Sequence, residues 1–169
     1  EGRLYLVAHD TDGFARWAVL QGLMEDAIAD GQVKPDLLQA LSTLVDDLAP
    51  RRPALLARML ELPELSWLMQ KMAPVAPRAL HDARVRVETE IGKHLLHKLL
   101  DVYKSTRDPA GAFEITPDAI ARRALHNTCL TYIMAADAAL GAGLALAQFK
   151  SAKTMTARIG AMSVLMDSD

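Results

Sequence analysis

The sequence of 169 residues has a single cysteine, few aromatic side chains and no excess of basic residues. Cys129 has no second cysteine to pair with, so an internal disulfide is excluded, and a lone cysteine fits a reducing compartment such as the cytoplasm. A formal net charge of -2 provides no basic footprint for nucleic acid. No apolar run is long enough to span a membrane, and no signal peptide opens the chain. We therefore expect neither a nucleic-acid partner nor a membrane partner.

The residues that are abundant favour helices. Hydrophobic residues make up 51% of the chain and aromatic residues only 5%, so Leu, Ala and Met supply most of the apolar surface. These side chains lose little rotamer freedom in a helix, and runs of β-branched residues are scarce. The length is sufficient for one domain with a sizeable core. The composition therefore predicts an all-α body.

Capping residues, glycines and prolines divide the chain into predicted helices. Asp12 is a good N-cap, Gly31 is a suitable C-terminal stop, and Pro35 and Pro53 are placed at first helical positions. Residues 1–8 are predicted to be extended. The predicted helices cover about 13–30, 35–48, 53–61, 64–72 and 78–104, one that Thr116 caps, one from Asp137 to Phe149, and a last one that begins near Ser151 or Thr154.

Short helices joined by tight, proline-marked turns are typical of stacked antiparallel helical hairpins, as in α-solenoids. No strict repeat period is visible in the sequence, so tandem repeats are not predicted from periodicity. In the first predicted helix Phe14, Trp17, Leu20, Met24 and Ile28 share one face, which we expect to be buried.

Three stretches carry a pattern that is more specific than composition. The first, D-x-D-x-F-x-R-W-x-x-x-Q, is formed by Asp10, Asp12, Phe14, Arg16, Trp17 and Gln21. The second is Ile120–Leu130, and the third is Ala147–Phe149 followed by Ala152–Thr156. In this order they resemble the C-terminal helical domain of bacterial aminopeptidase N, a zinc metallopeptidase of the gluzincin type. The family has Asn-Met-Thr-Asp where this chain has Thr154–Ala157, a departure that concerns the local helix cap.

The resemblance implies a fold and a place in a longer protein. The fold is an armadillo- or HEAT-like α-α superhelix of stacked helical hairpins. Residues 1–9 would be the tail of a preceding β-sandwich domain, and residues 10–169 the first part of the C-terminal helical domain, truncated at its C-terminal end. In the family this domain shapes and encloses the substrate cavity. The implied function is a non-catalytic segment of a zinc aminopeptidase that removes N-terminal amino acids from peptides.

The resemblance also implies the cofactor and the partners. In the family, zinc is bound by an H-E-x-x-H helix and a more distant Glu of the catalytic domain. This sequence has no such motif, because His94 and His97 have the wrong spacing and no Glu between them. We expect zinc in the parent enzyme only, no catalytic, cofactor-binding or metal-binding residue in this chain, and no activity of the chain alone. The expected partners are the catalytic and β-sandwich domains of the parent and, through them, peptide substrates.

Glu90, His94 and His97 are the best candidate metal ligands, because positions i, i+4 and i+7 of the longest predicted helix point the same way. The alternative interpretation is a solvated, charged face. The apolar stripe of this helix runs on the opposite side, through Ile91 and Leu95 to Leu99, Val102 and Tyr103. We favour the solvated face.

Cys129 is a candidate nucleophile if His126, three residues earlier, activates it. The favoured alternative is a buried cysteine that packs as a small hydrophobe among leucines and isoleucines. Gly141 and Gly143 lie within a helical Ala/Leu run, where they predict close helix packing or a kink.

Two further groups have a functional and a structural interpretation. Met69 and Met72 could form an adaptable binding surface, but methionines more often fill a core, and we favour the core. Arg16 and Asp12 could form a contact between domains, and the favoured alternative is a surface or interdomain salt bridge beside the helix cap.

Two other classes of protein are also considered for the whole chain. A stand-alone helical-repeat scaffold that binds a protein partner predicts a complete gene of about this length. A metal-binding helical bundle predicts zinc or iron in the purified chain. The aminopeptidase segment predicts a longer reading frame with H-E-x-x-H upstream.

Overall fold

The computed structural model describes residues 2–71, 76–109 and 114–166. Within these ranges the chain forms nine helices and no strand, which confirms the predicted all-α class. The helices are α1 (Gly2–His9), α2 (Gly13–Asp30), α3 (Pro35–Leu48), α4 (Pro53–Leu60), α5 (Leu65–Lys71), α6 (Pro77–Ser105), α7 (Pro117–Ala136), α8 (Ala138–Ser151) and α9 (Met155–Met166). No helix in these ranges combines the length and the hydropathy of a membrane span.

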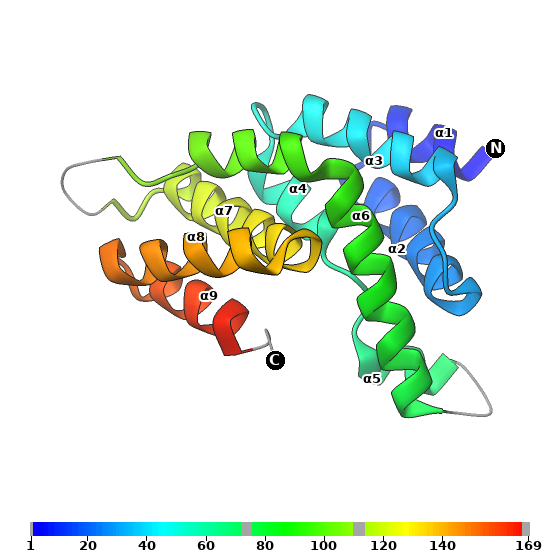
Figure 1. Cartoon of the computed structure of the whole chain (residues 1–169). Coiled ribbons are helices and arrows are strands. Elements are labelled where there is room, and N and C mark those ends of the chain that lie inside the picture. Colours follow the sequence, from blue (N-terminus) through cyan, green and yellow to red (C-terminus); the bar gives the residue numbers. More distant parts are fainter. Residues whose placement is uncertain (1, 72–75, 110–113, 167–169) are drawn as a thin grey trace.

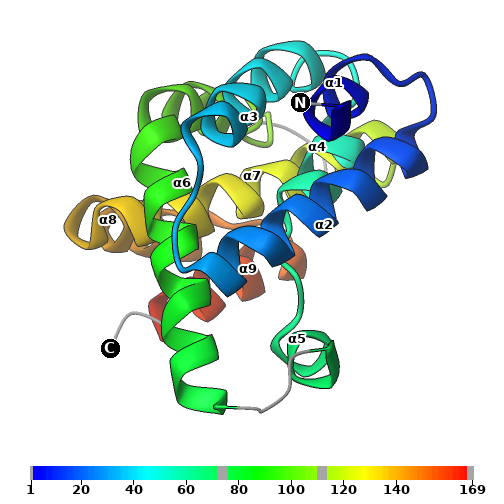
Figure 2. The same ribbon diagram turned by 90° about the vertical axis from the view of Figure 1, so that its right-hand side faces the viewer.

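The helices stack side by side as antiparallel neighbours (Figure 1). Helices α1 to α4 form one end of the stack and α8 and α9 the other, with α7 between them in contact with α4, α6, α8 and α9. The longest helix, α6, packs most extensively on α7 and also contacts α2, α3 and α5. In Figure 2 the short α5 lies beside the start of α6, apart from the main stack. The predicted architecture of stacked helical hairpins is confirmed.

The helix ends follow the capping residues of the sequence. The Asp12 carboxylate accepts a hydrogen bond from the amide of Phe14 at 2.8 Å, and Gly31 ends α2 in the left-handed conformation with φ 70°. Thr116 and Asp137 cap α7 and α8 through their side-chain oxygens. Each cap satisfies amides or carbonyls that the helix itself leaves without a partner, so short-range chemistry is sufficient to place these ends.

The extended backbone predicted for residues 1–8 is wrong over the described part, because Gly2–His9 is helical. This helix packs against α2 and α3 and buries Val7, which is 1% exposed. The carbonyl oxygen of Val7 accepts a hydrogen bond at 2.8 Å from Nε of Arg16 in α2. Packing against α2 and α3 therefore stabilises this helix. The assignment of residues 1–9 to a preceding domain stays a prediction, and Glu1 lies outside the described residues.

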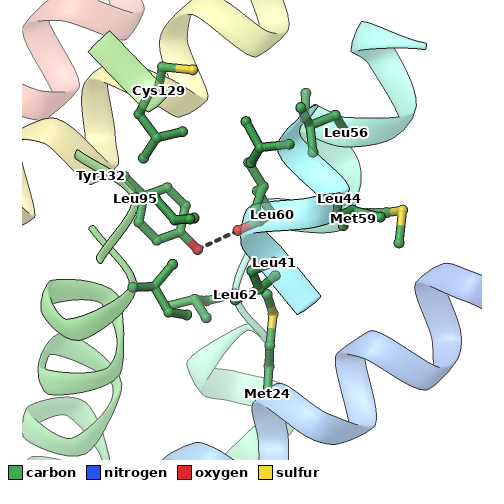
Figure 3. Packing of buried hydrophobic residues seen from close by; sticks show 14 of the residues in the cluster. Met24, Leu41, Leu44, Leu56, Met59, Leu60, Leu62, Leu95, Cys129 and Tyr132 are labelled. Atoms are coloured by element: carbon green, nitrogen blue, oxygen red, sulfur yellow. Dashed lines mark hydrogen bonds between the residues drawn. The ribbon is translucent and has the colours of Figure 1, made fainter. Parts of the chain in front are cut away.

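The apolar stripes of the helices meet in one continuous core (Figure 3). In α6 the predicted stripe is confirmed, since Ile91, Leu95 and Leu99 are fully buried. In α2 the deep residues Leu20, Met24 and Ile28 are buried as predicted, but Phe14 is 70% exposed. Phe14 lies in the first turn of α2, and its ring contacts that of Trp17 in a tilted arrangement with centroids 5.6 Å apart. The N-terminal end of the predicted stripe is thus wrong.

The two glycines of α8 differ in their surroundings. A Cβ atom on Gly141 would collide with the backbone of Met134 in α7, whereas a Cβ atom on Gly143 would meet nothing within 4 Å. The predicted close packing is therefore confirmed for Gly141 and wrong for Gly143. Among the methionines, Met69 is half-buried and Met72 lies outside the described residues.

Candidate functional site

A pocket of about 730 Å³ opens between the end of α6, the helices α7 and α8, and the start of α9. Its buried side is polar. The hydroxyl of Tyr103 in α6 donates to Oε1 of Gln148 in α8 at 3.0 Å. Nε2 of Gln148 donates in turn to Oδ1 of Asn127 at 2.9 Å and to the carbonyl of Ala157 at 2.8 Å. One side chain, Gln148, therefore connects α6, α7 and α9 at the base of this pocket.

His126 of α7 lies beside this network. Its ring stacks on the ring of Tyr103 with centroids 3.9 Å apart and an angle of 14° between the planes. The Thr106 hydroxyl donates to the carbonyl of Val102 at 2.7 Å, so its oxygen is free to accept from Nδ1–H of His126 at 3.2 Å. Burial lowers the pKa of His126, which favours the neutral ring at neutral pH.

The edge of the pocket near residue 108 is closed by an ion pair. Nε of Arg123 in α7 lies 2.9 Å and 3.2 Å from the two carboxylate oxygens of Asp108. Its Nη2 atom also donates to the carbonyl of Glu114. The Arg123 side chain is only 9% exposed, and its Nε–H group is shared between the two oxygens in a charge-assisted contact. This pair fixes the segments on both sides of residues 110–113 against α7.

Cys129 does not belong to this pocket. It is fully buried in the core, and burial raises the pKa of its thiol to about 12 (Figure 3). No hydrogen bond joins Cys129 to His126 in the described structure, and the hydrogen bond of His126 is made with Thr106 instead. A thiol with such a pKa is a poor nucleophile, because the thiolate is the reactive form. The interpretation of Cys129 as a small core hydrophobe is confirmed.

Glu90, His94 and His97 are exposed on α6, as the solvated-face interpretation predicts. Glu90 is engaged, because its Oε2 accepts a hydrogen bond from the amide of Val33 at 2.8 Å. No group of three or more His, Cys, Asp or Glu side chains that could hold a metal ion occurs in the described ranges. These residues do not fit a zinc site of the kind that peptide hydrolysis requires.

A second pocket, of about 520 Å³, lies between α2, α4 and α5. Glu25 organises it, accepting from Nε1 of Trp67 at 2.7 Å and from Nζ of Lys71 at 2.8 Å. Nε2 of Gln21 donates across it to the carbonyl of Glu61 at 2.8 Å. These contacts connect α5 to α2. They were not predictable from the sequence, because the partners are separated by 40 or more residues.

The predicted surface location of Arg16 is wrong, whereas its alternative, a salt bridge between domains, stays a prediction. Arg16 is 6% exposed, and its nearest carboxylate is that of Asp47 in α3, with Nη2 to Oδ2 at 3.9 Å. Its contact with Asp12 is the backbone bond of the first helical turn, at 3.0 Å. The guanidinium is buried because α1 covers it and Val7 offers a carbonyl, a contact that the predicted extended segment did not include.

Over residues 1–169 the chain matches the family described as a domain of unknown function (DUF3458_C) with ARM repeats. The chain belongs to this family. The ARM-repeat description agrees with the stacked helices, and the resemblance to the C-terminal helical domain of aminopeptidase N is confirmed by the relatives.

This ARM-repeat domain is 34% identical over 168 residues to the aminopeptidase N of Caulobacter vibrioides, a match that covers 95% of this chain and 19% of the relative. The Escherichia coli aminopeptidase N is 25% identical, with 94% of this chain and 19% of the relative covered. Among solved structures, Legionella pneumophila aminopeptidase A in complex with aspartic acid has a TM-score of 0.83 at 19% identity. It covers 97% of this chain and 21% of that protein, and shows the fold alone. The chain thus spans about a fifth of the length of these proteins.

The sequence did contain a signal for the first pocket of this domain. The stretch Ile120–Leu130 supplies Arg123, His126 and Asn127, and the stretch Ala147–Phe149 supplies Gln148. Two of the three stretches that carry the resemblance therefore converge on one pocket. Each was identified in the sequence as a family pattern, but only the packing of α7 against α8 shows that they form a single site.

Proposed function

We propose that this chain is a non-catalytic helical segment of a zinc aminopeptidase, and that it shapes and encloses the substrate cavity of the parent enzyme. The observation that carries the proposal is the 34% identity to an aminopeptidase N over nearly the whole chain, at a fifth of the relative's length. The parent would remove N-terminal amino acids from peptides in the cytoplasm, and its catalytic and β-sandwich domains would be the partners of this segment.

The chemistry of the parent would come from residues outside this sequence. Zinc, when bound, activates water for attack on the scissile carbonyl. The histidines of this chain do not have the H-E-x-x-H spacing, and Glu90 is hydrogen-bonded to a backbone amide on the outer face of α6. The segment would act by position: a rigid stack of helices beside the cavity limits which peptides enter and excludes water from the reaction.

The packing of the chain suits such a role. Interhelical contacts through buried polar groups, such as the Tyr103–Gln148 hydrogen bond, fix the helices at defined positions in addition to the apolar core. A wall that keeps its shape can hold a cavity at constant dimensions.

The first test is to read the gene that encodes this segment. The proposal expects an open reading frame several times longer than 169 codons, with an H-E-x-x-H motif upstream of this segment. A reading frame with its own start and stop around these residues would overturn the proposal and favour the stand-alone scaffold.

The second test is complementation. The parent without this segment is expected to lose most hydrolysis of peptide substrates, and the separate chain is expected to restore part of it without being active alone. Because Gly141 contacts the α7 backbone and Gly143 does not, the Gly141→Ala chain should restore less activity than the Gly143→Ala chain. Full activity of the deleted parent, or peptide hydrolysis by the chain alone, would contradict the proposal.

A further inference from the structure

The pocket between α6, α7, α8 and α9 is strongly basic although the chain as a whole is not. Its lining includes Lys104, Arg107, Arg123 and Lys153, against one acidic side chain, Asp108. The formal charge of the whole chain is -2, so this concentration of positive charge is local. A concave surface lined by charges of one sign raises the local concentration of ions of the opposite sign.

The acidic side chain does not neutralise the pocket, because it is already used. Asp108 is paired with Arg123, so it does not offset the positive charges of Lys104 and Arg107. The ion pair that Lys104 forms with Asp101 is long, at 3.8 Å, and solvent-exposed. Exposed pairs of this kind are worth little and leave the cation available.

Arg107 is the basic side chain best placed to receive a ligand. Within the described ranges it has no ion-pair partner, and it is exposed at the pocket. Arg107 lines the same pocket as Tyr103 and His126, which form its polar base. A guanidinium offers up to two parallel N–H donors to a carboxylate or a phosphate.

The apolar residues that line the pocket, together with its volume, indicate the chemistry and size of the rest of the ligand. Leu100, Leu144 and the exposed Ala147 line the pocket beside the basic residues. The volume of about 730 Å³ lies in the range of sites for organic small molecules and exceeds what an inorganic anion fills. Polar groups at the base, such as Gln148, are bonded to one another and need no ligand atom.

We propose that this pocket binds an organic anion of metabolite size, with its carboxylate or phosphate group on Arg107 and its apolar body against the α6 and α8 walls. This site goes beyond the proposed function, because it requires neither zinc nor the parent enzyme.

The test uses the 169-residue chain and two probes that differ only in charge. N-acetylphenylalanine carries a carboxylate and an apolar ring, and N-acetylphenylalaninamide is its neutral analogue. Titration calorimetry should detect binding of the acid, at least about tenfold tighter than the amide, since a charge-assisted contact contributes that much or more. Phenyl phosphate distinguishes the two headgroups: tighter binding than the acid assigns a phosphate ligand, and weaker binding assigns a carboxylate.

Two variants of equal charge locate the site. Arg107→Gln should weaken binding of the acid by about tenfold or more. Arg78→Gln removes the same charge from an exposed position in the first turn of α6, at the opposite end of that helix, and should leave binding unchanged. Ala147→Trp should block the pocket without disturbing the core, because Ala147 is exposed. Equal binding of acid and amide, no binding of either anionic probe, or an equal effect of Arg78→Gln would overturn the proposal.

Discussion

The hydroxyl of Tyr132 in α7 donates a hydrogen bond of 2.6 Å to the carbonyl of Leu60, the last residue of α4 (Figure 3). The two residues are 72 positions apart and both are buried. The last carbonyls of any helix lack partners within the helix, and those that are buried must find one elsewhere. The Tyr132 hydroxyl of α7 thus provides the donor that the last carbonyl of α4 lacks within its own helix. This hydrogen bond joins the N-terminal helices to the centre of the stack.

We predict that Tyr132→Phe lowers the free energy of unfolding by about 1–3 kcal/mol, because it leaves the buried Leu60 carbonyl without a donor while keeping the ring. Urea denaturation followed by circular dichroism measures the change. Tyr5→Phe is the matched control, since Tyr5 is 66% exposed and its loss of a hydroxyl should have little effect. Equal stability of the Tyr132→Phe variant and the wild type would show that this bond does not join the hairpins.

The two glycines of α8 provide a pair of opposite predictions. Gly143→Ala should stabilise the chain by about 0.5–1 kcal/mol, since alanine favours a helix and the new methyl group meets open space. Gly141→Ala should destabilise it by about 1–3 kcal/mol, because the methyl group would force α8 away from Met134 in α7. Chemical denaturation of both variants checks the prediction. Stabilisation by both substitutions would mean that α7 and α8 are not in close backbone contact.

Cys129 is predicted to be unreactive in the folded chain. Burial raises the pKa of the thiol to about 12, so the reactive thiolate is scarce at pH 8, and the side chain is fully buried. Labelling with iodoacetamide at pH 8, followed by mass spectrometry, should be slow in buffer and fast in urea. Rapid labelling of the folded chain would instead indicate an accessible, activated thiol and would revive the nucleophile interpretation.

Features that depend on a few neighbouring residues were predictable from the sequence. The caps at Asp12, Thr116 and Asp137 use side chains within three positions of the amide they bind. The buried stripe of α6 follows from a 3.6-residue period, and the exposed face with His94 and His97 is its complement. Local chemistry therefore determined these helix ends and the side that α6 presents to the core.

Features that depend on distant partners were not predictable in the same way. The first helix, α1, forms where a strand was expected, and it is stabilised by burial of Val7 and by the Arg16 side chain of the following helix. The pocket network likewise joins Tyr103 to Gln148, which are 45 positions apart. Tyr103 was predicted only as part of the apolar stripe of its helix and Gln148 only as part of a family pattern, so the packing of α6 and α8 on α7 is what identifies them as parts of one site.

His126 makes the stability of the chain depend on pH. Burial is the main cause that lowers its pKa in the folded state below the ordinary value of 6.5, with a smaller contribution in the same direction from Arg107, while Asp108 and the Tyr103 and Gln148 contacts oppose the shift. The unfolded chain therefore takes up a proton at this residue at a higher pH than the folded chain does. The contribution of His126 to the free energy of unfolding is therefore fully present above pH 6.5. It is lost as the pH falls from there toward the pKa that His126 has in the folded chain.

We therefore predict that the free energy of unfolding decreases between pH 7 and pH 5, measured by urea denaturation at each pH. His126→Gln should be less stable at pH 7, because it loses the ring stack on Tyr103, but its stability should depend less on pH over the same interval. His97→Gln, which changes an exposed histidine of α6, should keep the wild-type profile. If His126→Gln retained the full pH dependence, the decrease would have to come from another group. That result would contradict the claim that protonation of the buried His126 destabilises the folded chain.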